Sequence, residues 1–88
     1  MKLILTIISD TDSENVSKAL ISNGFHLTRI ASTGGFFHRG NTTLMIGVED
    51  EKVDQAIQLI HNSVYPPSER GEKSATLFVL NVEDYTQI

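Results

Sequence analysis

Cysteine is absent from this 88-residue chain, which excludes a disulfide framework and a thiolate metal site and favours a reducing compartment. Long apolar runs are absent too, because no stretch approaches the roughly 20 residues that cross a bilayer. The apolar start, MKLILTIIS, is short, has no small-residue cleavage site and ends at an acidic turn, so we interpret it as a strand. We therefore expect a cytoplasmic protein with no membrane partner.

Basic residues are few: 7 Lys and Arg stand against 11 Asp and Glu, which gives a net charge of −4. This balance disfavours a nucleic-acid partner, because proteins that bind nucleic acids gain affinity by neutralising many phosphates. Acidic residues are missing altogether between positions 15 and 48, where the chain carries Lys18, His26, Arg29, His38 and Arg39. The sequence thus permits a local site for a small anion in an acidic protein.

The apolar pattern predicts one domain over residues 1–88 with the order βαββαβ. The predicted elements are a strand over 2–9, a helix over 12–23, strands over 25–33 and 42–48, a helix that begins at Asp50, and a strand over 75–82. This order is typical of the α+β, ferredoxin-like fold, in which two helices cover one face of a four-stranded antiparallel sheet.

Residues at the predicted helix ends have the pattern of helix caps. Thr11 and Glu14 have the spacing of a capping box, and Gly24 is placed to close the same helix. Asp50 is placed to cap the second helix. The buried stripes predicted for the two helices are Val16, Ala19, Leu20 and Asn23 in the first and Val53, Ala56, Ile57 and Ile60 in the second.

The predicted sheet is apolar on both faces, since residues 4–8 and 77–80 do not alternate with polar side chains. Helices cover only one face of such a sheet. Something else must cover the second face, and identical subunits that pack sheet against sheet would do so. We therefore expect a closed homo-oligomer.

Residues 32–47 hold the main candidate site. Gly35, with Gly34 and Gly40, permits close backbone approach, and successive amides there could bind an anion. Phe36 and Phe37 offer aromatic surfaces beside the polar Asn41, a combination that suits a nucleotide. The same glycines could instead mark a turn and the same phenylalanines could lie in a core. The spacing matches neither a Walker A nor a Rossmann fingerprint.

Catalytic and metal sites are not indicated. His26, His38 and His61 fall in three different elements without ligand spacing, so we expect no metal. His26 shares a strand face with Thr28, which makes it a candidate ligand contact. No hydroxyl stands out beside a base and an orienting group, and the acidic residues at 49–54 suit a helix N-terminus. We therefore expect a protein that is not an enzyme and needs no cofactor.

The segments at 31–36 (ASTGGF), 40–43 (GNTT) and 47–50 (GVED) carry a resemblance to a known family. The chain resembles the PII-like cyclic-di-AMP receptors, a family of small signalling proteins, over its first 60 or so residues and again from Ala75 to Gln87. The resemblance implies a homotrimer that binds cyclic-di-AMP in clefts between subunits and signals to a protein target. It also implies that the ligand contacts are Thr28, Phe36, Phe37, Asn41, Gly47, Phe78 and Gln87.

The chain departs from the family pattern in three places. Gly24 and His26 stand where the family has Asn and Arg, and the connection over 61–74 is much shorter. Histidine side chains are mostly neutral at pH 7 whereas arginine stays charged, so a phosphate contact is weakened. These departures keep a second hypothesis open: a diverged PII-like protein-interaction module that binds another anion or does not bind cyclic-di-AMP.

Overall fold

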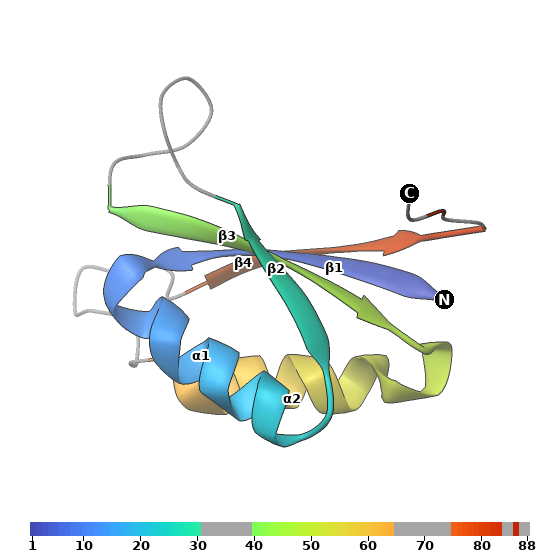
Figure 1. The fold of residues 1–88 in the computed structure, drawn as a ribbon, viewed down its shortest axis with the longest axis horizontal. Helices are drawn as coiled ribbons and strands as arrows, with labels where there is room; N and C mark the ends of the chain where they lie inside the picture. Colours follow the sequence, from blue (N-terminus) through green and yellow to red (C-terminus); the bar gives the residue numbers. More distant parts are fainter. Residues whose placement is uncertain (31–39, 65–74, 84–85, 87–88) are drawn as a thin grey trace.

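The computed structural model of the chain describes residues 1–30, 40–64, 75–83 and 86. In these residues the elements are β1 (Lys2–Ser9), α1 (Asp10–Ser22), β2 (His26–Ile30), β3 (Asn41–Val48), the 3₁₀ helix η1 (Asp50–Lys52), α2 (Val53–Ser63) and β4 (Ala75–Asn81). Figure 1 shows one sheet with both α-helices on the same side of it. The predicted α+β class and βαββαβ order are therefore confirmed.

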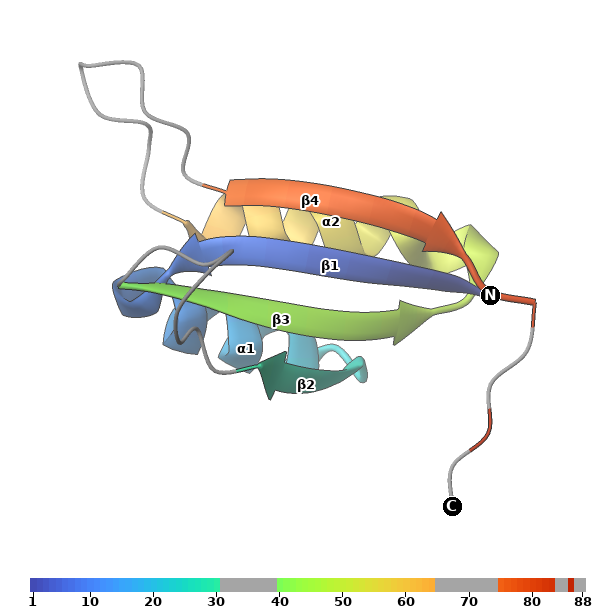
Figure 2. The ribbon, with the colours of Figure 1, turned by 90° about the horizontal axis from the view of Figure 1, so that it is seen from above.

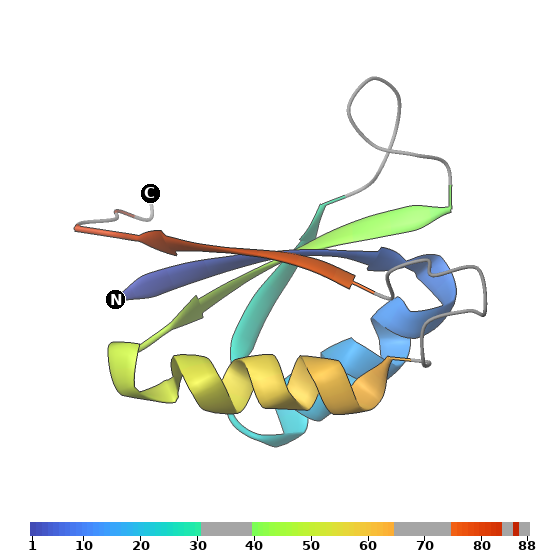
Figure 3. The ribbon, with the colours of Figure 1, turned by 180° about the vertical axis from the view of Figure 1, so that it is seen from behind.

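The four strands form one antiparallel sheet in the order β2-β3-β1-β4. Figure 2 shows β1 in the middle of the sheet, between β3 and β4. Figure 3 shows from behind that α2 runs along the same side as α1, so the helices make a single layer. None of the helices that the structure describes is long and apolar enough to cross a membrane.

The core lies between the sheet and the helix layer. Alternate residues of β1 and β3 point into it, since successive side chains of a strand face opposite sides. The buried apolar residues are Ile4, Ile8, Leu44, Ile46 and Val48 from the sheet, Val16, Leu20, Ala56 and Ile60 from the helices, and Phe25. The predicted helix stripes are confirmed at the four helix positions in this list, whereas Asn23, also predicted in the first stripe, is the exposed C-cap of α1.

The N-terminus of α1 differs from the prediction. The helix begins at Asp10, and its N-cap is Ser9, whose hydroxyl accepts a hydrogen bond from the Asp12 N–H at 3.3 Å. Thr11, the predicted cap, instead pairs its hydroxyl with that of Ser9 at 3.1 Å. The prediction was wrong because Ser9 and Thr11 are both hydroxyl residues followed by an acidic residue, so the sequence does not distinguish them. Ser9 is the cap because it ends β1 in the extended conformation that a cap residue adopts.

The C-terminus of α1 is closed by Gly24, as predicted. Gly24 has φ +85°, a left-handed conformation that glycine adopts without strain. The Gly24 N–H donates to the Ile21 carbonyl at 3.0 Å and the Phe25 N–H to the Leu20 carbonyl at 3.0 Å. This pair of bonds is a Schellman motif, and it carries the chain from the helix layer back to β2.

The start of the second helix also differs from the prediction. Asp50 begins η1 and makes no side-chain cap, and α2 begins only at Val53. The Asp50 carboxylate instead accepts a hydrogen bond from the Met1 ammonium at 3.0 Å. This hydrogen bond and the charge of the ammonium lower the pKa of Asp50. The interaction fixes the start of β1 to η1.

Candidate ligand-binding site

The sheet has a second face that neither described helix covers. Residues paired across antiparallel strands point to the same side, so the register defines the rows of this open face. One row consists of His26, Gly47, Leu3 and Leu80. The next row consists of Thr28, Met45, Leu5 and Phe78. These two rows are largely apolar, with their polar side chains on β2, and the following row adds Thr43 on β3 and Thr76 on β4.

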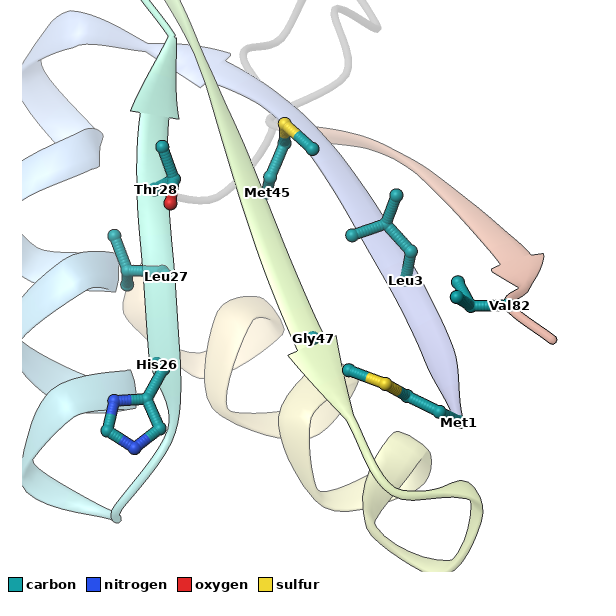
Figure 4. Close-up of a pocket in the computed structure, with 8 residues that line it drawn as sticks. All are labelled: Met1, Leu3, His26, Leu27, Thr28, Met45, Gly47 and Val82. Carbon is teal, nitrogen blue, oxygen red and sulfur yellow. The ribbon is translucent and has the colours of Figure 1, made fainter. Parts of the chain in front are cut away.

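A concavity of about 630 Å³ lies at one end of the open face. Its lining consists of Met1, Leu3, His26, Leu27, Thr28, Met45, Gly47 and Val82, which Figure 4 shows as sticks. Gly47 lies between His26 and Leu3 in the first row of the open face, and it has no side chain. The missing side chain accounts for the hollow in the sheet surface.

Met1 lies over this hollow. A Cβ atom added to Gly47 would stand 2.9 Å from the Met1 Cε, which is too close for an ordinary contact. Glycine at position 47 therefore lets the Met1 thioether approach the backbone of β3. The Met1 carbonyl also accepts a hydrogen bond from the Val82 N–H at 3.0 Å, which holds the residue before β1 beside the residue after β4 at the rim of the concavity.

A smaller hollow of about 150 Å³ adjoins the first one. Its lining consists of Asn23, Gly24, Phe25, His26, Gly47, Val48, Glu49 and Lys52. His26 and Gly47 line both hollows. The smaller hollow brings two charged side chains, Glu49 and Lys52, to the neighbourhood of the His26 imidazole.

Three of the predicted contacts come together in the larger concavity, namely His26, Thr28 and Gly47. Phe78 lies on the same open face and in the same row as Thr28. Three strand spacings separate the two, or about 14 Å. Phe78 is not among the residues that line the concavity, which reaches the β4 side of the sheet at Val82 instead.

Asn41 also lies away from the concavity. It pairs with Ser9 at the opposite end of β3 from Gly47. Six residues of an extended strand span about 20 Å. The other predicted contacts, Gly35, Phe36, Phe37 and Gln87, lie outside the described residues.

Several lining residues were not predicted: Met1, Leu3, Met45 and Val82. Their signal in the sequence was the apolar character of both faces of the first strand, which indicated a contact surface without specifying a pocket.

The structure explains why glycine is accepted at position 24. Its left-handed backbone is one that glycine and asparagine adopt most easily, so Gly24 keeps the turn while it removes an amide side chain.

Metal ligands are not clustered in the part of the chain that the structure describes, where no group of three or more His, Cys, Asp or Glu is placed to hold an ion. The concavity is lined mainly by apolar side chains, with a hydroxyl and an imidazole at one side. Apolar linings with few polar groups, in volumes of about 300–1,000 Å³, are typical of small-molecule sites.

The fold and the concavity define the class of protein: a ferredoxin-like domain with a small-molecule-sized hollow on its open sheet face. The model of the cyclic-di-AMP receptor family matches residues 1–70. The chain belongs to the cyclic-di-AMP receptor family, as the sequence resemblance indicated.

A solved structure supports the fold over almost the entire chain. The chain is similar to a crystal structure of a functionally unknown protein from Pediococcus pentosaceus, with 30% sequence identity and a TM-score of 0.78. The similarity covers 99% of this chain and 96% of that one.

Proposed function

We propose that this chain is a cytoplasmic signalling receptor that binds cyclic-di-AMP between the subunits of a homotrimer and relays binding to a protein target without catalysis. The observation that carries the proposal is the position of the candidate contacts. In a chain of this family, His26, Thr28 and Gly47 meet in one concavity of small-molecule size.

The chemistry of the concavity suits a dinucleotide. Leu3, Met45 and Val82 offer apolar surface for an adenine ring. The Thr28 hydroxyl can donate to a phosphate or a base edge, and Gly47 allows close approach.

The distances between candidate contacts favour a site shared by subunits. Asn41 lies about 20 Å from Gly47 along β3, and Phe78 about 14 Å from Thr28 across the sheet. Neither Asn41 nor Phe78 lines the concavity of the single chain. If two copies meet with opposite ends of their strands adjacent, both groups can contact the same ligand.

The exposed apolar surface supports self-association of the chain. Phe78 and Leu80 on the open face are 50% and 46% exposed in the single chain. Burial of such side chains stabilises an assembly by about 1.5 to 3 kcal/mol each. Packing of open faces against one another would supply this burial and would place the concavities at subunit boundaries.

Isothermal titration against cyclic-di-AMP, cyclic-di-GMP and ATP tests the proposal. We expect saturable binding of cyclic-di-AMP at one site per subunit, and chromatography of the mixture should recover the ligand unchanged. Thr28→Val should weaken binding about fivefold by loss of one hydrogen bond. Arg29→Gln is the matched control, because Arg29 is the next residue of β2 and lies on its other face. Absence of binding in the unmodified protein would refute the proposal.

A second candidate function is a PII-like interaction module that binds another anion or none. The observation that favours it is the composition of the concavity, whose polar groups at the β2 side are a histidine and a threonine without an arginine. A trimer in solution that gives no heat with cyclic-di-AMP would support this candidate. If His26→Arg then created binding, the diverged contact would be identified.

A further inference from the structure

We propose that His26 makes ligand binding pH-dependent, because its imidazole takes up a proton when an anionic ligand enters the concavity. This inference rests on the proposed function, since it concerns the same site. It adds that the affinity for a phosphodiester ligand rises as the solution becomes more acidic.

The position of His26 carries the inference. His26 is exposed and is the first residue of β2, and its register partner on β3 is Gly47. Gly47 has no side chain, and the Met1 thioether lies over it, so the imidazole and Met1 share the same hollow. His26 lines both the larger and the smaller hollow, so a ligand that fills either one meets its ring. Figure 4 shows the imidazole at the start of β2, on the rim of the site.

The charges that face His26 are of both signs. Glu49 and Lys52 line the smaller hollow with it, from the end of β3 and from η1. Met1 lines the larger hollow, and its ammonium is paired with Asp50. The last turn of α1 contributes no charged side chain. On β2 itself, Arg29 faces the opposite side of the sheet. Among the described residues, Glu49, Lys52 and the Met1 ammonium are thus the charges to which an incoming phosphate would be added.

The chemistry follows from the two forms of imidazole. A neutral ring donates one hydrogen bond, whereas the charged ring donates from both nitrogens and gains charge-assisted contacts to a phosphate oxygen. An imidazole changes charge between about pH 5 and 8, a range in which phosphodiesters stay ionised and adenine stays neutral. A ligand that prefers the charged ring must promote its protonation, because the coupling between the two equilibria is reciprocal.

Titrations of cyclic-di-AMP into the intact protein at about pH 5.5, 6.5 and 8 test this inference. We expect about tenfold tighter binding at the lowest pH than at the highest, the gain of a charge-assisted over a neutral hydrogen bond. Repetition in buffers with different ionisation heats should show proton uptake on binding. His26→Gln should abolish both the uptake and the pH dependence. His26→Arg should bind tightly and equally at all three values.

Two variants separate His26 from the other histidines. His61→Gln alters an exposed histidine of α2 and should leave the pH dependence unchanged. His38→Gln should also leave it unchanged; if this variant removed the dependence while His26→Gln kept it, the inference would be overturned. Binding by the unmodified protein with a pH-independent Kd would overturn the inference and leave the proposed function standing. No binding at any pH would refute the proposed function itself.

Discussion

The two faces of the sheet are built by the same strands, yet the helices that the structure describes cover only one of them. On the helix side, Ile4, Leu44 and Ile46 are 0% exposed, whereas Phe78 and Leu80 on the open side keep 50% and 46% of their surface exposed. Each buried apolar side chain contributes about 1.5 to 3 kcal/mol. Alternate positions of one strand can thus serve two purposes, the fold of the chain and the contacts it makes with others.

The largest effect is expected from neighbouring residues of β3 that face opposite sides. Leu44→Ala should lower the free energy of unfolding by about 2 to 5 kcal/mol, because it leaves a cavity in the core. Met45→Ala should cost less than about 1.5 kcal/mol in dilute protein, since Met45 lies on the open face and is only half-buried. Urea denaturation of both variants measures the two costs.

Equal costs in this pair would mean that the open face is covered as tightly as the helix face even in dilute solution. A cost for Met45→Ala that grows with protein concentration would instead show that assembly is the source of the burial of Met45.

The next effect concerns assembly. Leu5→Glu places a charge in the middle of the open face, at a position paired with Met45 and Phe78. We expect at least about a hundredfold weaker self-association, since a buried unpaired charge is strongly unfavourable. Analytical ultracentrifugation measures the loss, and circular dichroism checks that the fold remains. Leu5→Met, which preserves the volume and the apolar character, is the control. Unchanged association in Leu5→Glu would show that the open face is not the contact.

A smaller effect is expected at the turn that joins the helix layer to the sheet. Gly24→Ala should lower the free energy of unfolding by about 1 kcal/mol, because alanine at φ +85° is strained. Gly24→Asn should cost less, since asparagine tolerates this conformation. Thermal denaturation compares the two. An alanine variant as stable as the parent would show that the turn and the start of β2 relax to accommodate the new side chain.

The smallest effect concerns the pair between Asp50 and the Met1 ammonium. The pKa of Asp50 is lower in the folded chain than its ordinary value of 3.8. Its contribution to stability is thus present above that value and is lost as pH falls through the lower, folded value. Asp50→Asn should slightly reduce the melting temperature near about pH 7, and the difference should vanish near about pH 2 and at about 1 M salt. Glu51→Gln is the control, and a difference that persists in acid would contradict the assignment.

The sequence predicted the elements well because their periodic patterns reflect burial directly. The β1 bounds Lys2–Ser9 and the Gly24 closure of α1 agree with the structure, and the core residues Leu20 and Ile60 lie on the predicted stripes. Helix N-termini were predicted less well. Several polar residues precede each helix, and Ser9 rather than Thr11 is the cap. Which hydroxyl or carboxylate caps depends on the backbone conformation at the end of the preceding strand, which composition does not reveal.

The candidate site was predicted only in part, for a geometric reason. His26 and Thr28 were correctly placed on one strand face, and their meeting with Gly47 follows from the β2–β3 register. The role of Met1 in the concavity could not be predicted, because it depends on a contact between the first residue and the strand that ends at Val48.

The central place of β1 in the sheet has a consequence for synthesis. The ribosome makes this strand first, but one of its two partners is made last, since Ile8 pairs with Ala75 and Lys2 with Asn81. A nascent chain that has not reached β4 can pair β1 on one side only, and the unpaired side exposes the backbone of a strongly apolar strand. We therefore expect translation arrest or truncation before Ala75 to yield chains that aggregate, while the completed chain closes its sheet in a late, long-range step.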